Sequence, residues 1–375
     1  MDFIDLSAQQ EIIREKIEKR IKAVLAHGQY IMGPEVFELE EKLKSYVGVS
    51  NCISCSSGTD ALIISLIAKG IGPGDAVITT SFSYIATAEA IALVGATPIF
   101  CDIYPETFNI NPNGLEEAYD KAILEGLTPK GIISVDLFGL PARFRLIDEF
   151  AKLKNLFLLE DAAQGFGGSI GNRKACTFGD VSATSFFPAK PLGAYGDGGA
   201  IFTNNDELAE KMRSIRVHGS GLDKYNNIRL GLNGRLDTLQ AAILIEKLAI
   251  IDLELTLRNN IAIIFSENIN PNFTLPYVPD NYFSSWAQYS VLLKNGEERE
   301  KMVDYLGNNN IPTNIYYKIP LHLQRVFKYL NYKKGEFPQS ESIANRIISI
   351  PMHPYLNEVD QQFIINKTNS FSKLH

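Results

Sequence analysis

Residues Leu156 to Gln164 read LFLLEDAAQ, a short apolar run that ends in two acids and a turn of small residues. A continuous apolar run of this length is typical of a strand whose two faces are both buried. Such strands belong to parallel sheets covered by helices, and ligands bind at their carboxyl ends. Asp161 lies at that end, so we expect it at a ligand site. For this residue alone, a helix cap or a local ion pair is the alternative.

Further apolar, β-rich runs lie on both sides of this strand along the chain, and helix-like segments separate most of them. They are Ala76–Thr80, Thr97–Ile103, Gly131–Leu137, Val181–Phe187 and Gly199–Thr203. Short strands alternating with helices predict an α/β domain with a large, mostly parallel sheet covered on both faces. Helical periodicity also predicts N-terminal helices at Gln9–His27 and Glu35–Tyr46, and one long helix from about Leu236 to Leu255.

A smaller lobe is expected at the C-terminus. The Pro- and Asn-rich stretch Asn268–Asn281 precedes an expected strand at Gln288–Leu293 and expected helices at Glu297–Leu306 and Gln339–Ile348. The chain is therefore divided into a large domain, residues 1–250, which includes the N-terminal helical segment, and a smaller C-terminal α+β domain, residues 251–375. A length of 375 residues is compatible with two such lobes.

The composition is that of an ordinary folded protein. With 36 Lys+Arg against 43 Asp+Glu, the net charge of −7 argues against a basic surface for nucleic acid or anionic lipid. No apolar run is long enough to span a membrane, and the N-terminal residues lack the apolar centre of a signal peptide, so we expect a cytoplasmic protein. The four cysteines are too few for a disulfide scaffold, and Cys52 and Cys55 lack a second pair at zinc spacing. We expect buried thiols and no metal site, with redox use as the alternative.

The turn Ser56–Leu62, SSGTDAL, follows a strand-like segment at Cys52–Cys55 and opens a helix. A helix N-terminus offers unpaired N–H groups and the positive end of the helix dipole, and Gly58 lets the backbone approach a ligand closely. The turn therefore suits a phosphate group, although an ordinary capped surface helix has the same kinds of residue.

Lys190 lies in a glycine-dense loop with aromatic, proline and leucine residues close to it on both sides. Desolvation by such neighbours lowers the pKa of a lysine and frees its amine as a nucleophile, as Schiff-base chemistry requires. Asp161, the phosphate-suited turn and the aromatic segment Phe82–Tyr84 complete a set that matches the needs of pyridoxal 5'-phosphate (PLP). That cofactor requires a Schiff-base lysine and an acid that keeps its pyridine nitrogen protonated.

Four ordered motifs resemble the nucleotide-sugar aminotransferases of the DegT/DnrJ/EryC1/StrS family. They are SGTDAL at 57–62, EDAAQ at 160–164, SFFPAK at 185–190 with GDGGA at 196–200, and GLNGRLD at 231–237. The resemblance runs from Gly33 to Tyr355, nearly the whole chain. It implies a PLP enzyme of fold type I, with a seven-stranded, mostly parallel sheet and active sites shared across a homodimer.

The resemblance also implies roles for single residues. Lys190 matches the Schiff-base lysine, which also moves the 1,3-proton in the reaction. Asp161 matches the partner of the pyridine nitrogen, and Gln164 matches a residue that contacts the ring hydroxyl. The other implied cofactor contacts are Gly58, Thr59 and Ser185 at the phosphate, Tyr84 over the ring, and Asn233 from the partner subunit. For Tyr84 the alternative is a core aromatic, and for Asn233 a plain turn residue. The family's usual amino donor, L-glutamate, implies a ping-pong cycle.

Within the family, the resemblance is densest to the branch that aminates UDP-2-acetamido-2-deoxy-3-oxo-D-glucuronate, a UDP-sugar used for surface polysaccharide. HGQYIMGPE at 27–35 and PMHPY at 351–355 are part of it. In that branch a His-Tyr pair follows a late Pro-Thr, whereas Tyr316 and Tyr317 follow it in this chain, so one substrate contact differs. These two tyrosines are nevertheless expected to contact the substrate.

A uronate substrate requires a fixed cation, and Arg235 is the candidate because its planar fork can hold a carboxylate by two hydrogen bonds. A structural ion pair with Asp237 or a neighbouring acid is the alternative for this arginine. The alternative substrate is a 4-keto-6-deoxy nucleotide sugar, which has no carboxylate to hold.

Three other functions are less compatible with these residues. Related sugar dehydratases have histidine in place of the Schiff-base lysine, and a non-catalytic PLP-fold sensor would lose the amine, so Lys190 argues against both. A nicotinamide-dependent enzyme requires a glycine-rich turn directly after the first strand, and this sequence has none.

Overall fold

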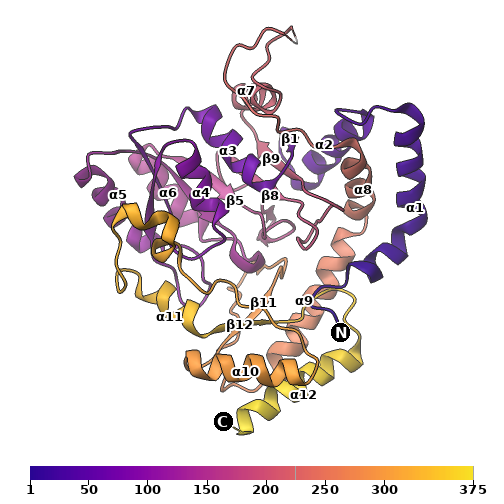
Figure 1. Ribbon diagram of the computed structural model, residues 1–375, viewed down its shortest axis with the longest axis vertical. Coiled ribbons are helices and arrows are strands. Elements are labelled where there is room, and N and C mark those ends of the chain that lie inside the picture. Colours follow the sequence, from indigo (N-terminus) through magenta and orange to yellow (C-terminus); the bar gives the residue numbers. More distant parts are fainter. Residues whose placement is uncertain (224, 375) are drawn as a thin grey trace.

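A seven-stranded sheet forms the centre of the larger part of the molecule (Figure 1). The computed structural model describes residues 1–223 and 225–374, so residue 375 of the expected C-terminal domain lies outside the described residues. The strand order is β1-β9-β8-β5-β4-β2-β3, and neighbouring strands are parallel except where β9 is one of the pair. The strands are β1 (Asn51–Cys55), β2 (Asp75–Thr80), β3 (Thr97–Cys101), β4 (Thr128–Val135), β5 (Phe157–Asp161), β8 (Val181–Ser185) and β9 (Gly199–Thr203). The predicted mostly parallel, seven-stranded sheet is confirmed.

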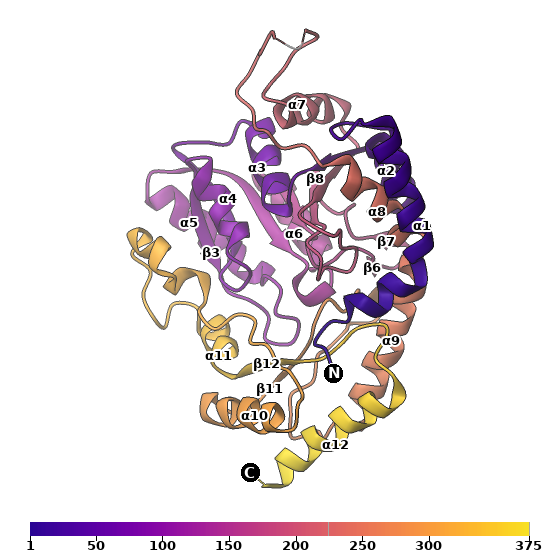
Figure 2. The same ribbon diagram turned by 45° about the vertical axis from the view of Figure 1, so that its right-hand side comes forward.

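Helices cover both faces of this sheet, which explains why its strands are continuously apolar. One face packs against α3, α4 and α7, and the other against α5 and α6 at one end and α2 and α8 at the other. The helix α1 lies along the outside of α8 (Figure 2). These helices are α1 (Leu6–His27), α2 (Pro34–Val47), α3 (Gly58–Lys69), α4 (Ala86–Leu93), α5 (Leu115–Leu124), α6 (Phe144–Lys154), α7 (Asp206–Arg216) and α8 (Thr238–Leu248). All four cysteines are buried free thiols, as expected.

A second apolar core lies in the C-terminal part of the chain, around Tyr289 and Phe265. The helix α9 (Ile251–Asn268) belongs to both cores, because Ile251 and Leu255 pack in the first and Phe265 in the second. The remaining elements are β6 (Ser169–Ile170), β7 (Arg173–Lys174), β10 (Tyr282–Phe283), β11 (Tyr289–Leu292), β12 (Ile347–Ile350), α10 (Gly296–Asn308), α11 (Pro338–Arg346), α12 (Glu358–Leu374) and the short 3₁₀ helices η1 (Pro112–Gly114), η2 (Leu137–Gly139), η3 (Leu321–Leu323) and η4 (Arg325–Leu330). In the described part of the chain, no helix is long and apolar enough to cross a membrane. The exact domain boundary at residue 250 stays a prediction.

Two predicted helices differ from the structure. The single helix expected from Leu236 to Leu255 is two helices, because the backbone at Ile250 has φ −114° and ψ 0° and turns the chain between α8 and α9. The expected helix Gln339–Ile348 ends at Arg346, because Ile347 and the residues after it pair with β11. Both differences arise from tertiary packing that local periodicity does not describe.

After α7 the chain leaves the body of the molecule and returns as a projecting segment, seen at the top of Figure 1. Isolated bridges join Val217 to Asn233 and Ser220 to Asn227 across it. Two of its apolar side chains, Leu222 and Leu230, are almost fully exposed. Leu232, near the base of the segment, packs against the core formed by α3 and α7, whereas Leu222 and Leu230 stay exposed.

Candidate active site

A cavity of about 410 Å³ opens at the carboxyl ends of the parallel strands. Open α/β sheets place ligand sites in this position. All of the predicted site residues except Asn233 and Arg235 line this cavity: Gly58, Thr59, Tyr84, Asp161, Gln164, Ser185, Lys190, Tyr316 and Tyr317. The structure therefore brings together residues that are far apart in the sequence.

The turn between β1 and α3 forms one wall of the cavity. The Ser57 side chain caps α3 by accepting a hydrogen bond from the Asp60 N–H at 3.0 Å. A Cβ atom on Gly58 would lie 2.6 Å from the Cβ of Ser185, so glycine is required here for β8 to come this close. The helix N-terminus and the Ser185 hydroxyl thus face one space in which a phosphate would receive several hydrogen bonds.

Asp161 ends β5 and is buried at the floor of the cavity. Its Oδ2 accepts a hydrogen bond from the Thr87 hydroxyl at 2.8 Å, and its Oδ1 accepts one from the Ala163 N–H at 3.2 Å. Burial raises the pKa of Asp161, while these hydrogen bonds and the charge of Lys190 oppose the rise. A cation placed against this carboxylate, such as a protonated ring nitrogen, would relieve the cost of its burial.

Lys190 follows β8 in a turn in which its N–H donates to the Phe187 carbonyl at 2.8 Å. Desolvation lowers the pKa of Lys190 to about 8, and Asp161 partly offsets this change. The predicted desolvation is thus confirmed. A large fraction of the Lys190 amine is therefore neutral at mildly alkaline pH and can act as a nucleophile.

Gln164 and Tyr317 form a hydrogen-bonded wall opposite the turn. The Gln164 Nε2 donates to the Tyr317 hydroxyl at 2.8 Å, and the Gln164 Oε1 accepts from the Phe138 N–H at 2.6 Å. The second Nε2 hydrogen of Gln164 is therefore the donor that remains for a ligand. The ring of Tyr84 lies 6.3 Å from that of Tyr317, and Tyr84 is 59% exposed. Tyr84 is thus a cavity residue and not the core aromatic that was its alternative.

Asn233 and Arg235 lie outside this cavity, at the base of the projecting segment. The Arg235 Nη2 donates to the Asn233 Oδ1 at 2.5 Å, and the buried Arg235 Nε has no hydrogen-bond partner within the described residues. No ion pair between described residues includes Arg235, so neither Asp237 nor a neighbouring acid pairs with it.

Several residues that line the cavity or support it were not predicted. Thr87 is the most informative, because it holds Asp161 and is itself within 3.2 Å of the Ser83 hydroxyl. A threonine in an alanine-rich helix carries no sequence signal for this role. The other unpredicted cavity residues with polar side chains are Ser57, Ser83, Asp197 and Gln288.

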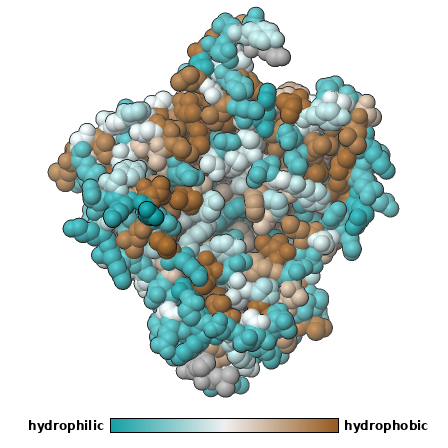
Figure 3. Space-filling model, viewed as in Figure 1, coloured by the Kyte–Doolittle hydropathy of each residue, from teal (hydrophilic) through white to brown (hydrophobic). Residues whose placement is uncertain are grey.

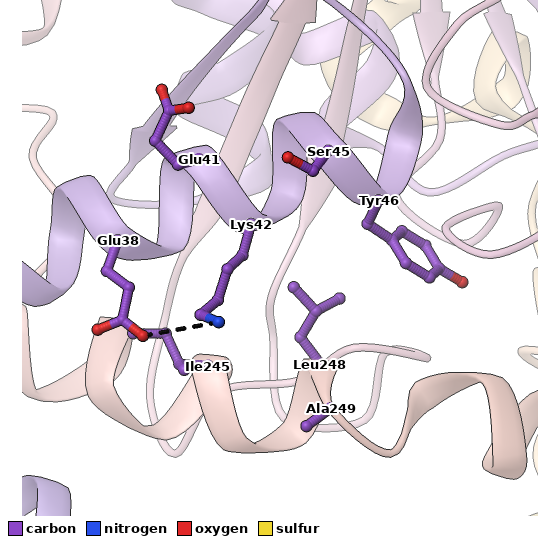
Figure 4. A pocket seen from close by; sticks show the side chains of 8 residues that line it. All are labelled: Glu38, Glu41, Lys42, Ser45, Tyr46, Ile245, Leu248 and Ala249. Carbon is purple, nitrogen blue, oxygen red and sulfur yellow. Dashed lines mark ion pairs between the residues drawn. The ribbon is translucent and has the colours of Figure 1, made fainter.

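A larger hollow, of about 650 Å³, lies between α2 and α8 (Figure 4). Its charged side chains include Glu38 and Lys42, which pair with each other at 3.8 Å. Tyr46 lies at one end of this hollow and donates its hydroxyl hydrogen to Asp252. Because these polar groups are already paired, the chemistry belongs to the cavity around Lys190.

Comparison with known proteins agrees with this geometry. Residues 11–369 match the DegT/DnrJ/EryC1/StrS aminotransferase family. The chain belongs to this family. It is 45% identical over 367 residues to UDP-2-acetamido-2-deoxy-3-oxo-D-glucuronate aminotransferase from Pseudomonas aeruginosa, covering 97% of this chain and 98% of that protein.

Two solved structures of related proteins extend the comparison. A DegT/DnrJ/EryC1/StrS aminotransferase from Brucella abortus has 49% identity and a TM-score of 0.95, with 99% of both chains covered. NtdA from Bacillus subtilis, solved with its bound cofactor PMP, has 29% identity and a TM-score of 0.88, with 99% of this chain and 83% of that chain covered. As a member of this family, the protein is a PLP-dependent sugar aminotransferase.

The residues of the cavity fit PLP. The glycine-lined turn suits the phosphate, the buried Asp161 suits a protonated ring nitrogen, and Lys190 supplies the amine. These three groups lie on three different elements that meet at one end of the sheet.

A second pair of buried acids, Asp136 and Glu160, supports the floor of the site. Glu160 accepts hydrogen bonds from the Cys176 N–H, the Phe178 N–H and the Ser182 hydroxyl. Asp136 accepts one from the Ala142 N–H, and its Oδ2 has no donor within the described residues. Burial, followed by the charge of Glu160, holds the pKa of Asp136 well above its usual range. The side chains of Asp136 and Glu160 interact, so Asp136 keeps its proton to a higher pH than an ordinary aspartate does.

This pair makes stability depend on pH. Because the pKa of Asp136 is higher in the folded than in the unfolded chain, its stabilising contribution is complete below the ordinary value of 3.8 and is lost as the pH rises toward the raised value. Asp136→Asn keeps a donor for Glu160 but cannot ionise. We expect its free energy of unfolding, measured by urea denaturation, to fall less than that of the wild type between acidic and alkaline buffer. The exposed control Asp148→Asn should follow the wild type, and parallel curves for Asp136→Asn would contradict the raised pKa of Asp136.

Proposed function

We propose that this enzyme transfers the amino group of L-glutamate to UDP-2-acetamido-2-deoxy-3-oxo-D-glucuronate, giving a 3-amino sugar for surface polysaccharide such as lipopolysaccharide O-antigen. The observation that carries the proposal is the cavity in which Lys190, Asp161 and the β1–α3 turn meet, in a chain 45% identical to an aminotransferase of that name. A cytoplasmic location stays a prediction from the sequence.

Residues of this chain have different roles in the proposed reaction. When bound, PLP supplies the electron sink that makes exchange of an amino group possible. Lys190 holds the cofactor and, with its lowered pKa of about 8, moves a proton at the reacting carbon. Asp161 keeps a positive charge on the ring nitrogen, and Thr87 fixes the carboxylate in place through its hydroxyl. Tyr84 covers the ring and limits the access of water.

Covalent capture tests the role of Lys190. Borohydride reduction of the PLP-loaded wild type should fix the cofactor on the peptide that contains Lys190, as measured by mass spectrometry. Lys190→Ala should lose this adduct and its turnover. Lys247 is a matched internal control because its pKa is also lowered to about 8, but it is buried in α8 and does not line the cavity. Modification of Lys247 instead, or full turnover of Lys190→Ala, would remove Lys190 from its role.

The charges of the cavity support a substrate-binding cation from outside the subunit. Lys190 is the one cation among the described lining residues, and Asp161 and Asp197 are both acids. Among the described residues that line the cavity, a uronate carboxylate therefore has no cation other than Lys190. Arg235 of the neighbouring subunit is the proposed partner, since its guanidinium lies beside Asn233 at the base of the projecting segment.

The substrate proposal predicts a preference that Arg235 creates. Wild-type enzyme should use the 3-oxo uronate better than its uncharged 6-hydroxyl and 6-deoxy analogues, measured as kcat/KM. In Arg235→Ala this preference should fall by about 1.5–3 kcal/mol, roughly ten- to more than a hundredfold, for one lost charge-assisted contact. The surface control Arg145→Ala should keep it. Equal use of the uncharged sugars by wild type would exclude a uronate, and faster use of a 4-keto-6-deoxy sugar would favour that alternative.

We also infer a homodimer with composite active sites. The projecting segment exposes Leu222 and Leu230, and the apolar surface of this face gathers near the base of the projection (Figure 3). Exposed apolar side chains that gather in this way favour a protein partner. Asn233, at the base of the segment, is proposed to contact the cofactor phosphate of the neighbouring subunit.

Subunit mixing tests the composite site. Lys190→Ala and Asn233→Ala homodimers should each have little activity. A mixed dimer of the two should recover about one good site, because one of its two sites contains both intact residues. Mixing two batches of Lys190→Ala is the control. If subunit exchange is verified by mass and no activity returns, each site is complete within one chain.

A further inference from the structure

A second polar hollow, of about 450 Å³, lies in the C-terminal part of the chain between α10, α11 and the loop that precedes α11. The two helices contact each other and lie below the seven-stranded sheet in both ribbon views (Figures 1 and 2). None of the residues that line this hollow lines the cavity around Lys190. It is therefore a separate site on the same subunit.

Three cations line this hollow: Arg299 on α10 and Lys318 and Lys334 on the loop. Both lysines are exposed, and neither makes an ion pair within residues 1–223 and 225–374. Their ammonium groups are thus available to a ligand. Ser342 and Asn345 on α11 add neutral polar groups to the same wall.

Arg299 is 8% exposed, so its guanidinium is held in place by the protein. Its Nη1 donates to the Ala344 carbonyl at 2.9 Å and its Nη2 to Glu300 at 2.8 Å. Its buried Nε has no partner within the described residues. A buried donor without a partner is costly, and a bound anion or water would satisfy it.

Glu341 is the one acid among the described residues that line the hollow, and it already has partners. Its carboxylate lies 3.0 Å from the His322 Nε2 and accepts the Gly335 N–H at 2.6 Å. The hydrogen bonds of Glu341 are therefore directed to its own loop. Glu300 also pairs with Arg299, so three cations against two acids leave a local charge of about +1, and the two unpaired lysines are the charges that would attract an anion.

We propose that this hollow is a binding site for a small phosphate-bearing metabolite, either a phosphate monoester or the diphosphate group of a nucleotide. Both carry two or more negative charges and several acceptor oxygens, which suit two mobile ammonium groups and one fixed guanidinium in the same hollow. The hollow and the active-site cavity are connected through the chain, because Lys318, which lines the hollow, follows Tyr317, which lines the cavity. The proposal does not depend on the identity of the keto sugar.

Calorimetric titration of the PLP-loaded enzyme with inorganic phosphate, diphosphate and UDP tests this site. Loading with PLP fills the phosphate position at α3, so that the probes do not compete for it. The double variant Lys318→Gln/Lys334→Gln removes two exposed charges and leaves every residue of the active-site cavity intact. Lys301→Gln on α10 is the matched control, because Lys301 pairs with Glu297 outside the hollow.

We expect wild type and Lys301→Gln to bind at least one of the probes saturably, and the double variant to bind it roughly tenfold or more weakly. Among the probes whose binding the double variant weakens, tightest binding of phosphate would identify a monoester site, and tightest binding of diphosphate or UDP a nucleotide site; UDP binding that all three proteins share belongs to the active-site cavity. Equal affinities in all three proteins, or no saturable binding to wild type, would overturn the proposal. Equal melting temperatures would show that the double variant is folded. The kcat of the wild type on the keto sugar tests the proposed function separately. Failure of the probes to bind the hollow would leave that kcat unchanged, whereas failure of the proposed function would show as a lack of turnover.

Discussion

The site depends on the close approach of two backbone segments that are distant in the sequence. A Cβ atom on Gly58 would meet Ser185 at 2.6 Å, and one on Gly199 would meet the Ser57 carbonyl oxygen at 2.5 Å. Side chains do not pack at such distances, so glycine at both positions allows the β1–α3 turn to lie against β8 and β9. The phosphate-suited turn and the strand that leads to Lys190 are thereby fixed relative to each other.

The two adjacent acids of β5 show how one strand serves both the fold and the chemistry. Successive side chains of a strand point to opposite faces, so Glu160 and Asp161 enter different surroundings. Glu160 accepts three hydrogen bonds from the chain around it, whereas Asp161 opens onto the cavity and is held by Thr87. The same chemical group is thus enclosed by the protein at one position and faces the cavity at the next.

Much of the fold could be predicted from the sequence because the strands are short, apolar and separated by helices. Gly58, Asp161 and Lys190 could be predicted as a set because together they match the needs of PLP, and the other predicted cavity residues came from the resemblance to the family. Thr87 could not, since its role depends on α4 lying beside the end of β5. The break at Ile250 could not either, because the sequence there contains no glycine or proline and α9 turns in order to join a second core. The role of Thr87 and the break at Ile250 both depend on contacts between segments that are distant in the sequence.

The position of β1 in the sheet determines when this strand can pair during synthesis of the chain. β1 is the first strand to leave the ribosome, but the neighbour with which it pairs is β9, where Asn51 lies opposite Thr203. The strands β2, β3, β4 and β5 pair among themselves and can form a sheet before β9 has been made. Until then β1 has an unpaired apolar edge, which is the kind of surface that other chains can bind. A chaperone that shields the first sixty residues would therefore act on this protein earlier than on one whose strands pair in sequence order.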